Sequence, residues 1–166
     1  MRSHFYLSVI AFLLLAGTIS CVPPMRLLPD EKEQVFSHVV DLRNEVIRTQ
    51  VVQFINEKFV SGKSVTQSID DGLITGNAIF MLEHKNQFGI REDAQMELTF
   101  LVKYVDNQYK TKCIVKRIIH ANINGIPTDL DEDRWGFYQK EINETIQKFD
   151  LDLLAYLTKK DDKFKF

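Results

Sequence analysis

Residues 65–78 read VTQSIDDGLITGNA and carry the clearest fold signal of the chain. The pair Asp71-Gly72 favours a tight two-residue turn between antiparallel strands. When Asp70 is paired with Leu73 across this turn, one face of the hairpin is mostly apolar and the other carries Ser, Thr and Asn side chains. The pairs expected on the apolar face are Ile69 with Ile74, Gln67 with Gly76 and Val65 with Ala78. The turn and the alternation therefore predict the same β-hairpin.

A second hairpin is expected further along the chain, with its turn at Asp106-Asn107. Pairing Val105 with Gln108 brings apolar residues opposite one another on one face. The expected partners are Tyr104 with Tyr109, Val102 with Thr111, Phe100 with Cys113, Leu98 with Val115 and, on the reverse face, Glu97 with Lys116. Between the two hairpins, the polar stretch 83–93 is expected to form a loop.

Two amphipathic helices and one more strand flank these hairpins. A strand is expected over 35–42, and apolar residues at helical spacing predict a helix over 44–59. A second helix, capped by Thr128 or Asp131, buries a stripe made of Ile142, Ile146, Phe149, Leu153 and Leu157. The order strand, helix, four strands, helix predicts an α+β unit with a five-stranded, mainly antiparallel sheet. Because two helices cover only one face of such a sheet, the other face is left to solvent or to a partner.

Size and composition fit one globular domain. The chain has 166 residues, of which 45% are hydrophobic and 27% charged. With 21 Lys and Arg against 23 Asp and Glu, the net charge is −2, which argues against a nucleic-acid binder that needs a basic surface. Two cysteines exclude a disulfide scaffold. We assign the domain to residues 35–158 and a charged, fraying tail to 159–166.

The first residues have the layout of an export signal. Residues 1–20 combine a short, positively charged start with an apolar run over 5–16. This run is shorter than the roughly 20 residues that a membrane-spanning helix needs. We therefore expect 1–20 to be a signal peptide, and the protein to be exported to the bacterial cell envelope.

Cys21 follows the small residue Ser20, and this junction resembles a bacterial lipobox. The resemblance implies that Cys21 carries acyl chains, which would anchor the domain to the inner or outer membrane. The proline-containing stretch 21–34 is then expected to be a stiff tether. The alternative is ordinary secretion, in which Cys21 lies by chance near the cleavage site and the protein is periplasmic or secreted.

Two segments, together with the order of elements, resemble a known family. Residues 51–59 (VVQFINEKF) and 70–77 (DDGLITGN) are similar to a family of Bacteroidota exported proteins described as a domain of unknown function, DUF4468. The likeness covers about residues 35–157 and implies a TBP-like fold and a lipoprotein-like export route. Phe54 stands where many members carry Trp. The resemblance implies no established activity.

The name of that fold raises the possibility of DNA binding. A TATA-box-binding protein uses two such units and a basic surface to bind the minor groove. This chain has one unit, a sequence pI of about 6.1 and an export signal. We therefore expect no nucleic-acid partner.

The sequence offers little chemistry for catalysis, metals or cofactors. Cys113 is expected to point into the core, and His38, His84 and His120 are too widely spaced for a zinc motif. The acidic stretch 129–133 lacks the glycine and the glutamate of a calcium loop, so helix capping is the preferred explanation. We expect no catalytic residues, no metal and no cofactor.

The sheet face away from the helices is the preferred candidate site. Apolar and lysine side chains alternate there: Leu73, Ile79, Met81, Leu101, Ile114 and Ile118 with Lys103, Lys110, Lys112 and Lys116. This mixture predicts a surface for an envelope protein, a peptide or a small ligand, against the alternative of scattered exposed apolar residues.

A non-enzymatic binding protein is thus the preferred function. The alternative is a small, hydrolase-like envelope enzyme with a site in the 83–93 loop, formed by His84, Arg91, Glu92 and Asp93. Convergence of these side chains around a deep pocket would favour the enzyme, and a flat apolar and lysine surface would favour binding.

Overall fold

The computed structural model describes residues 26–59, 65–85, 91–121 and 126–159. Its elements in chain order are α2 (Pro29–Lys32), β1 (Glu33–Val39), α3 (Asn44–Lys58), β2 (Val65–Asp70), β3 (Leu73–Lys85), β4 (Arg91–Val105), β5 (Gln108–Ala121), β6 (Pro127–Asp129), the 3₁₀ helix η1 (Glu132–Tyr138) and α4 (Gln139–Lys159). The predicted signal peptide and Cys21 lie outside the described residues.

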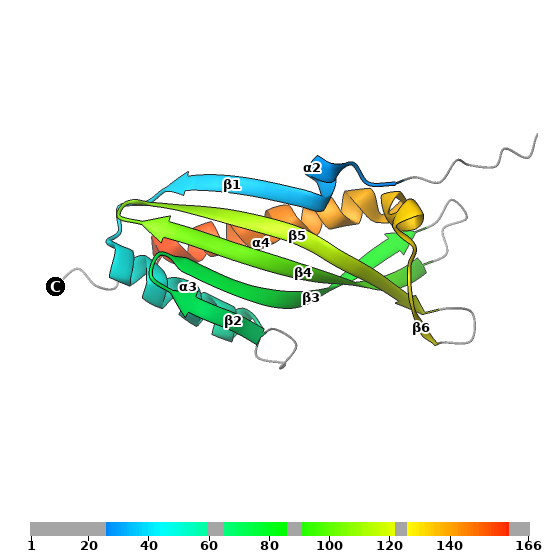
Figure 1. Cartoon of the computed structure of the whole chain (residues 1–166), viewed down its shortest axis with the longest axis horizontal. Coiled ribbons are helices and arrows are strands. Elements are labelled where there is room, and N and C mark those ends of the chain that lie inside the picture. The colour runs from blue at the N-terminus through cyan, green and yellow to red at the C-terminus, as the bar shows by residue number, and fades with distance from the viewer. Residues whose placement is uncertain (1–25, 60–64, 86–90, 122–125, 160–166) are drawn as a thin grey trace, which may run out of the picture.

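The strands form one antiparallel sheet in the order β1-β5-β4-β3-β2, with β6 pairing with the far end of β5. Both long helices, α3 and α4, lie on the same face of this sheet (Figure 1). The predicted α+β architecture is confirmed. The short β6, which the sequence did not indicate, adds a sixth strand.

Both predicted turns are present and set the register around them. Gly72 and Asn107 adopt positive φ angles of 79° and 64°, a conformation that glycine and asparagine tolerate better than other residues. The partners Asp70 with Leu73 and Val105 with Gln108 are confirmed. Around the second turn, every predicted inner pair as far as Leu98 with Val115 is confirmed.

Beyond these pairs, two β-bulges overturn the predicted register. One lies at Gln67, so that Thr66 rather than Gln67 pairs with Gly76. The other inserts Lys116 into β5, so that Glu97 pairs with Arg117 rather than Lys116. An extra residue in one strand reverses the face of every residue that follows it.

The core lies between the sheet and the two long helices. Its centre is the ring of Phe149 on α4, whose centroid lies 5.6 Å from that of Phe100, 5.8 Å from that of Phe54 and 5.9 Å from that of Phe80. The predicted stripe of α4 is confirmed as buried throughout: Ile142, Ile146, Phe149, Leu153 and Leu157. Gly76 leaves room for the Phe100 ring, because a Cβ atom there would lie 2.4 Å from Phe100 Cζ.

Three predicted boundaries were wrong. The loop expected over 83–93 is shorter, since β3 continues to Lys85 and β4 begins at Arg91. The strand expected over 35–42 is β1 over Glu33–Val39. The described part of the predicted tether, 26–34, belongs to the domain: it forms α2 and the start of β1, and Leu27 in it is only 2% exposed.

The second long helix begins differently from the prediction. A 3₁₀ helix, η1, precedes α4, and its N-cap residue Asp131 makes no side-chain capping hydrogen bond. Thr128, the other expected cap, lies in β6. The acidic side chains near this start form ion pairs instead: Asp133 with Arg26, Glu132 with Lys32, and Asp129 with Arg117.

Candidate functional site

The face of the sheet opposite α3 and α4 is open, as Figure 1 shows. We call this surface the open face; it is formed by the outward residues of β3, β4 and β5. Among its predicted members, Ile79, Leu101 and Ile114 are half-buried by their neighbours, and Met81 is 56% exposed. The open face therefore holds apolar side chains that no described helix covers.

Ile118 does not belong to this surface, contrary to the prediction. Its exposed fraction is 0%, and it packs in the core on the helix side of the sheet. The bulge at Lys116 shifts the alternation of β5 by one residue, so that Ile118 points inward. Ile119 is half-buried and takes the opposite orientation.

The predicted lysines fall into two groups. Lys103 and Lys110 are directly opposite each other and both exposed. No ion pair of either lysine occurs among the residues that the structure describes. Lys112, by contrast, binds Glu33 at 2.5 Å. The exposed Lys116 lies at the bulge, further along β5.

Two further hydrogen bonds on the open face were not predicted from the sequence. Arg117 donates a hydrogen bond to Glu97 at 2.6 Å, which is the main reason that its pKa is raised. A polar row crosses β3, where Thr99 Oγ1 donates to Asn77 Oδ1 at 2.7 Å and Ser68 contacts Thr75 at 3.0 Å. The turn at Asp71-Gly72 predicts the pair of Ser68 with Thr75, which is confirmed, whereas the contact of Thr99 with Asn77 needed the register of β3 with β4.

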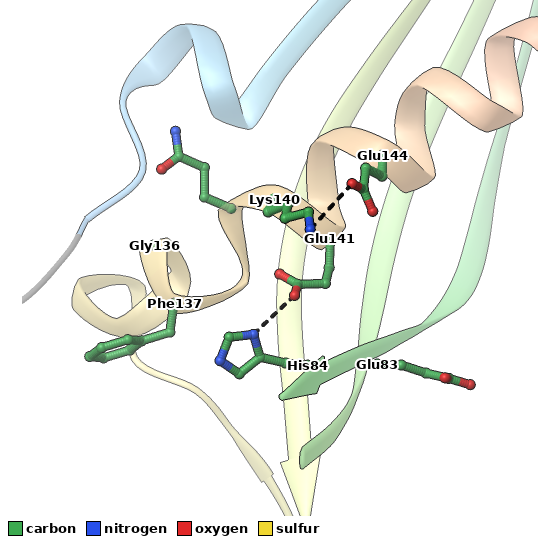
Figure 2. A pocket seen from close by; sticks show the side chains of 8 residues that line it. Glu83, His84, Gly136, Phe137, Lys140, Glu141 and Glu144 are labelled. Carbon is green, nitrogen blue, oxygen red and sulfur yellow. Dashed lines mark hydrogen bonds and ion pairs between the residues drawn. The ribbon is translucent and has the colours of Figure 1, made fainter. Parts of the chain in front are cut away.

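A groove of about 700 Å³ lies at the end of β3, beside η1 and the start of α4 (Figure 2). The lining residues are Glu83, His84, Gly136, Phe137, Gln139, Lys140, Glu141 and Glu144. His84 Nδ1 lies 3.0 Å from Glu141 Oε1. Glu141 Oε2 is buried without a hydrogen-bond partner in the described part of the chain. Burial raises the pKa of the neighbouring Tyr138, and the carboxylates of Glu92, Glu141 and Asp93 raise it further.

This groove contains only part of the site predicted for the alternative enzyme. His84 lines it, but its carboxylate partner Glu141 comes from α4 rather than from the 83–93 stretch. Glu92 and Asp93 are exposed and do not line the groove. No Ser, Thr or Cys side chain is among the described residues that line the groove, so these residues supply no hydroxyl or thiol nucleophile.

A buried polar cluster lies between β1, β5 and α4. His38 Nε2 lies 2.7 Å from Asp150 Oδ2, and the Asp150 side chain is only 3% exposed. Burial, and then the charge of Asp150, raises the pKa of Cys113 to about 12, and the same two causes raise the pKa of Tyr109. A thiol with such a pKa is a poor nucleophile, in line with the inward orientation expected for Cys113.

The described ranges give no sign of a metal site or a membrane-crossing helix. Within them, no three His, Cys, Asp or Glu side chains are arranged to hold a metal ion. Among their helices, none is both long and apolar enough to cross a bilayer.

The class that this architecture defines is a TBP-like α+β domain with one face of its sheet open. A solved DUF4468 family protein from Bacteroides ovatus shares the fold, with a TM-score of 0.62 and 8% identity over 80% of this chain and 90% of that one. A TBP-like protein from Parabacteroides distasonis matches with a TM-score of 0.59 and 8% identity, over 81% of this chain and 97% of that one. Neither a family model nor a curated protein matches the sequence.

Proposed function

We propose that this protein is an exported, lipid-anchored member of the DUF4468 family that binds an acidic polypeptide of the cell envelope on its open face. The observation that carries this proposal is the pair of exposed lysines, Lys103 and Lys110, beside Leu101 and Ile114 on a sheet face that no described helix covers. In this proposal the protein acts by binding and catalyses no reaction.

The charge pattern favours an acidic partner. Side chains directly opposite each other on antiparallel strands have Cβ atoms about 5 Å apart. Two like charges at the ends of such side chains repel each other and destabilise the pair. Lys103 and Lys110 hold this relation. A carboxylate placed between them would relieve the repulsion, while Leu101 and Ile114 would add apolar contact. The open face thus combines an electrostatic and an apolar contribution to the same partner.

Photo-crosslinking in cells tests this proposal. The photoreactive residue p-benzoylphenylalanine replaces Met81 on the open face or, as a control, Leu151, which is 59% exposed on α4. We expect a discrete protein adduct from position 81 and none from position 151. The charge reversal Lys103→Glu with Lys110→Glu should reduce the adduct about tenfold or more, as expected for loss of about 1.4 kcal/mol or more of binding free energy.

Two results would overturn the proposal of an acidic partner at this surface. Equal adducts from positions 81 and 151 would mean that the open face has no special role. An adduct from position 81 that survives the charge reversal would mean that the partner is not recognised through these lysines.

The anchor is proposed from the junction of Ser20 and Cys21. Several acyl chains on Cys21 would hold the domain at a membrane, since each buried methylene contributes about 0.8 kcal/mol. Labelling with an alkyne fatty acid should mark the wild-type chain and not the Cys21→Ala variant, and globomycin should block processing. An unlabelled wild-type chain would favour ordinary secretion.

The hydrogen bond between His84 and Glu141 supports a second candidate function. An imidazole oriented by a carboxylate at the edge of a groove is able to activate water as a general base. In this case the purified protein should hydrolyse simple chromogenic esters, and His84→Ala should abolish the activity while the chain remains folded by circular dichroism. Absence of turnover, or turnover unchanged by His84→Ala, would contradict this candidate.

A further inference from the structure

We propose that the end of the domain formed by α2 and η1 lies against the membrane surface, so that the opposite end, with Lys103 and Lys110, points away from the bilayer. This inference rests on the proposed lipid anchor at Cys21. It goes beyond that proposal because it assigns a phospholipid surface as the partner of one particular end of the molecule.

The first described residues are held firmly on this end. Arg26 Nη2 lies 2.5 Å from Asp133 Oδ1, and Leu27 is buried. Lys32 forms an ion pair with Glu132, and its Nζ atom lies 5.0 Å from the centroid of the Trp135 ring. These contacts join the residues before β1 to η1, 100 or more positions later in the chain. The domain therefore begins at this end, at a defined point.

The length of chain before that point limits the distance to the membrane. Five peptide links separate Cys21 from Arg26. At no more than about 3.6 Å per residue, their Cα atoms lie within about 18 Å of each other. Since the acyl chains on Cys21 would be inserted in the bilayer, Arg26 and the surface around it must lie close to the headgroups.

The same end presents apolar side chains to its surroundings. Leu28, directly before α2, is 58% exposed, and Phe137 on η1 is 44% exposed. Phe137 projects from η1 at the rim of the groove (Figure 2). Aromatic and aliphatic side chains of this kind insert at the boundary between headgroups and acyl chains. Two neighbouring acids, Asp133 and Glu132, are neutralised by ion pairs, which reduces repulsion from anionic lipids.

The orientation points the lysine end of the open face away from the bilayer. The strands run along the long axis of the molecule, and α2 and the β4–β5 turn lie toward opposite ends (Figure 1). Glu33, the residue that follows α2, pairs with Ile114, and Lys110 lies four residues further toward the β4–β5 turn. At roughly 3.3 Å per residue, Lys110 is about 13 Å along β5 from the position beside the end of α2. A partner bound at Lys103 and Lys110 would thus contact the part of the molecule that points away from the headgroups.

Photo-crosslinking to lipid in a bacterium that exports the full chain tests this orientation. Cells grown on radiolabelled phosphate carry the photoreactive residue at position 28 or 137, or at the control positions 105 and 151. Val105 at the far turn is 45% exposed and Leu151 on α4 is 59% exposed, so accessibility is matched. A diacylglyceryl group on Cys21 contains no phosphorus, so radioactivity crosslinked to the protein by light reports contact with a phosphate-bearing membrane lipid and not the anchor itself. We expect about fivefold more label at positions 28 and 137 than at the controls.

Alkyne fatty-acid labelling of the same samples separates the two proposals. If Cys21 is acylated but positions 28 and 137 give no more label than 105 and 151, the orientation is wrong and the anchor stands. If Cys21 is not acylated, both proposals fail. In the Cys21→Ala variant the label at 28 and 137 should fall to the level of the controls.

Discussion

The polar residues enclosed between β1, β5 and α4 are the place where single side chains matter most for stability. Asp150 and Cys113 are almost fully buried there, and His38 contacts Asp150 directly. Oδ1 of Asp150 and the hydroxyl oxygens of Tyr109 and Thr111 are buried without a hydrogen-bond partner in the described part of the chain. A buried polar atom without a hydrogen-bond partner lowers the stability of the fold. Losing one of the contacts that do exist in this cluster should therefore lower the free energy of unfolding more than losing a contact on the surface.

The Cys113 thiol should make stability fall at high pH. Its folded pKa of about 12 exceeds the ordinary value of 9.0, so the unfolded chain loses this proton first. The contribution is complete below about pH 9 and is lost as pH rises toward 12, by up to about 1.4 kcal/mol per pH unit. Urea unfolding at pH 7.5, 9 and 10 measures how the free energy of unfolding changes with pH, and Cys113→Ala should reduce this slope.

The raised pKa of Tyr109 should leave a remaining slope of the same sign in that variant. A flat profile in the wild type would contradict the burial of the thiol.

Removing the carboxylate of Asp150 should be strongly destabilising. The variant Asp150→Ala leaves the half-buried His38 without its hydrogen-bond partner, and we expect a loss of about 2 kcal/mol in the free energy of unfolding. The matched control is Glu144→Ala, which breaks the exposed pair with Lys140 at 3.8 Å. That change should cost less than about 0.5 kcal/mol. Equal losses in urea titrations of the two variants would argue against a stabilising contact between His38 and the buried Asp150.

At the scale of elements, the two turns are local signals and the two bulges are not. Asp71-Gly72 and Asp106-Asn107 can be recognised as turns from the sequence, because few residues other than glycine and asparagine readily adopt the positive φ angle that these turns need. The bulge at Lys116 has no such mark, since Lys116 and Arg117 are both charged and either would suit the solvent side. Its position depends on which side chain of β5 enters the core, and beyond Val115 this is Ile118. The prediction therefore held up to Leu98 with Val115 and failed beyond it.

The bulge can be tested with two neighbouring isoleucines. Ile118→Asp places a charge in the core, and we expect it to lower the free energy of unfolding by at least about 3 kcal/mol. Ile114→Asp, on the open face, should cost less than about 1 kcal/mol. Both are measured by urea unfolding followed by circular dichroism. Similar losses for the two variants would contradict the reversal of alternation at Lys116.

For the whole molecule, the architecture was predictable and its first residues were not. The periodicity of the helices and the hairpin turns were enough to predict an α+β unit with both helices on one face. The prolines before β1 indicated a tether, yet 26–34 packs on η1 through ion pairs such as that between Arg26 and Asp133. The hydrogen bond between His84 and Glu141 was equally hidden. Contacts over such separations leave no local pattern in a single sequence.

Two adjacent leucines measure whether residues 26–34 belong to the fold. Leu27 is 2% exposed and Leu28 is 58% exposed. Leu27→Ala should lower the free energy of unfolding by about 2–3 kcal/mol through the cavity that it leaves. Leu28→Ala should change it by less than about 0.5 kcal/mol. If Leu27→Ala is as mild as its neighbour, this segment is a tether after all.

The open face is the proposed binding surface of the molecule. Leu101 and Ile114 lie on it half-buried, flanked by exposed lysines. If these two side chains contact a partner, replacing both with aspartate should leave the domain folded but weaken binding of the partner.

The most direct test is the yield of the adduct from the photoreactive residue at position 81 in the double variant Leu101→Asp, Ile114→Asp. We expect the variant to stay folded, with a free energy of unfolding within about 2 kcal/mol of the wild type, and the adduct to fall at least about tenfold. A folded double variant that still forms the adduct at the wild-type yield would contradict the claim, and a variant that unfolds would mean that this face is part of the core.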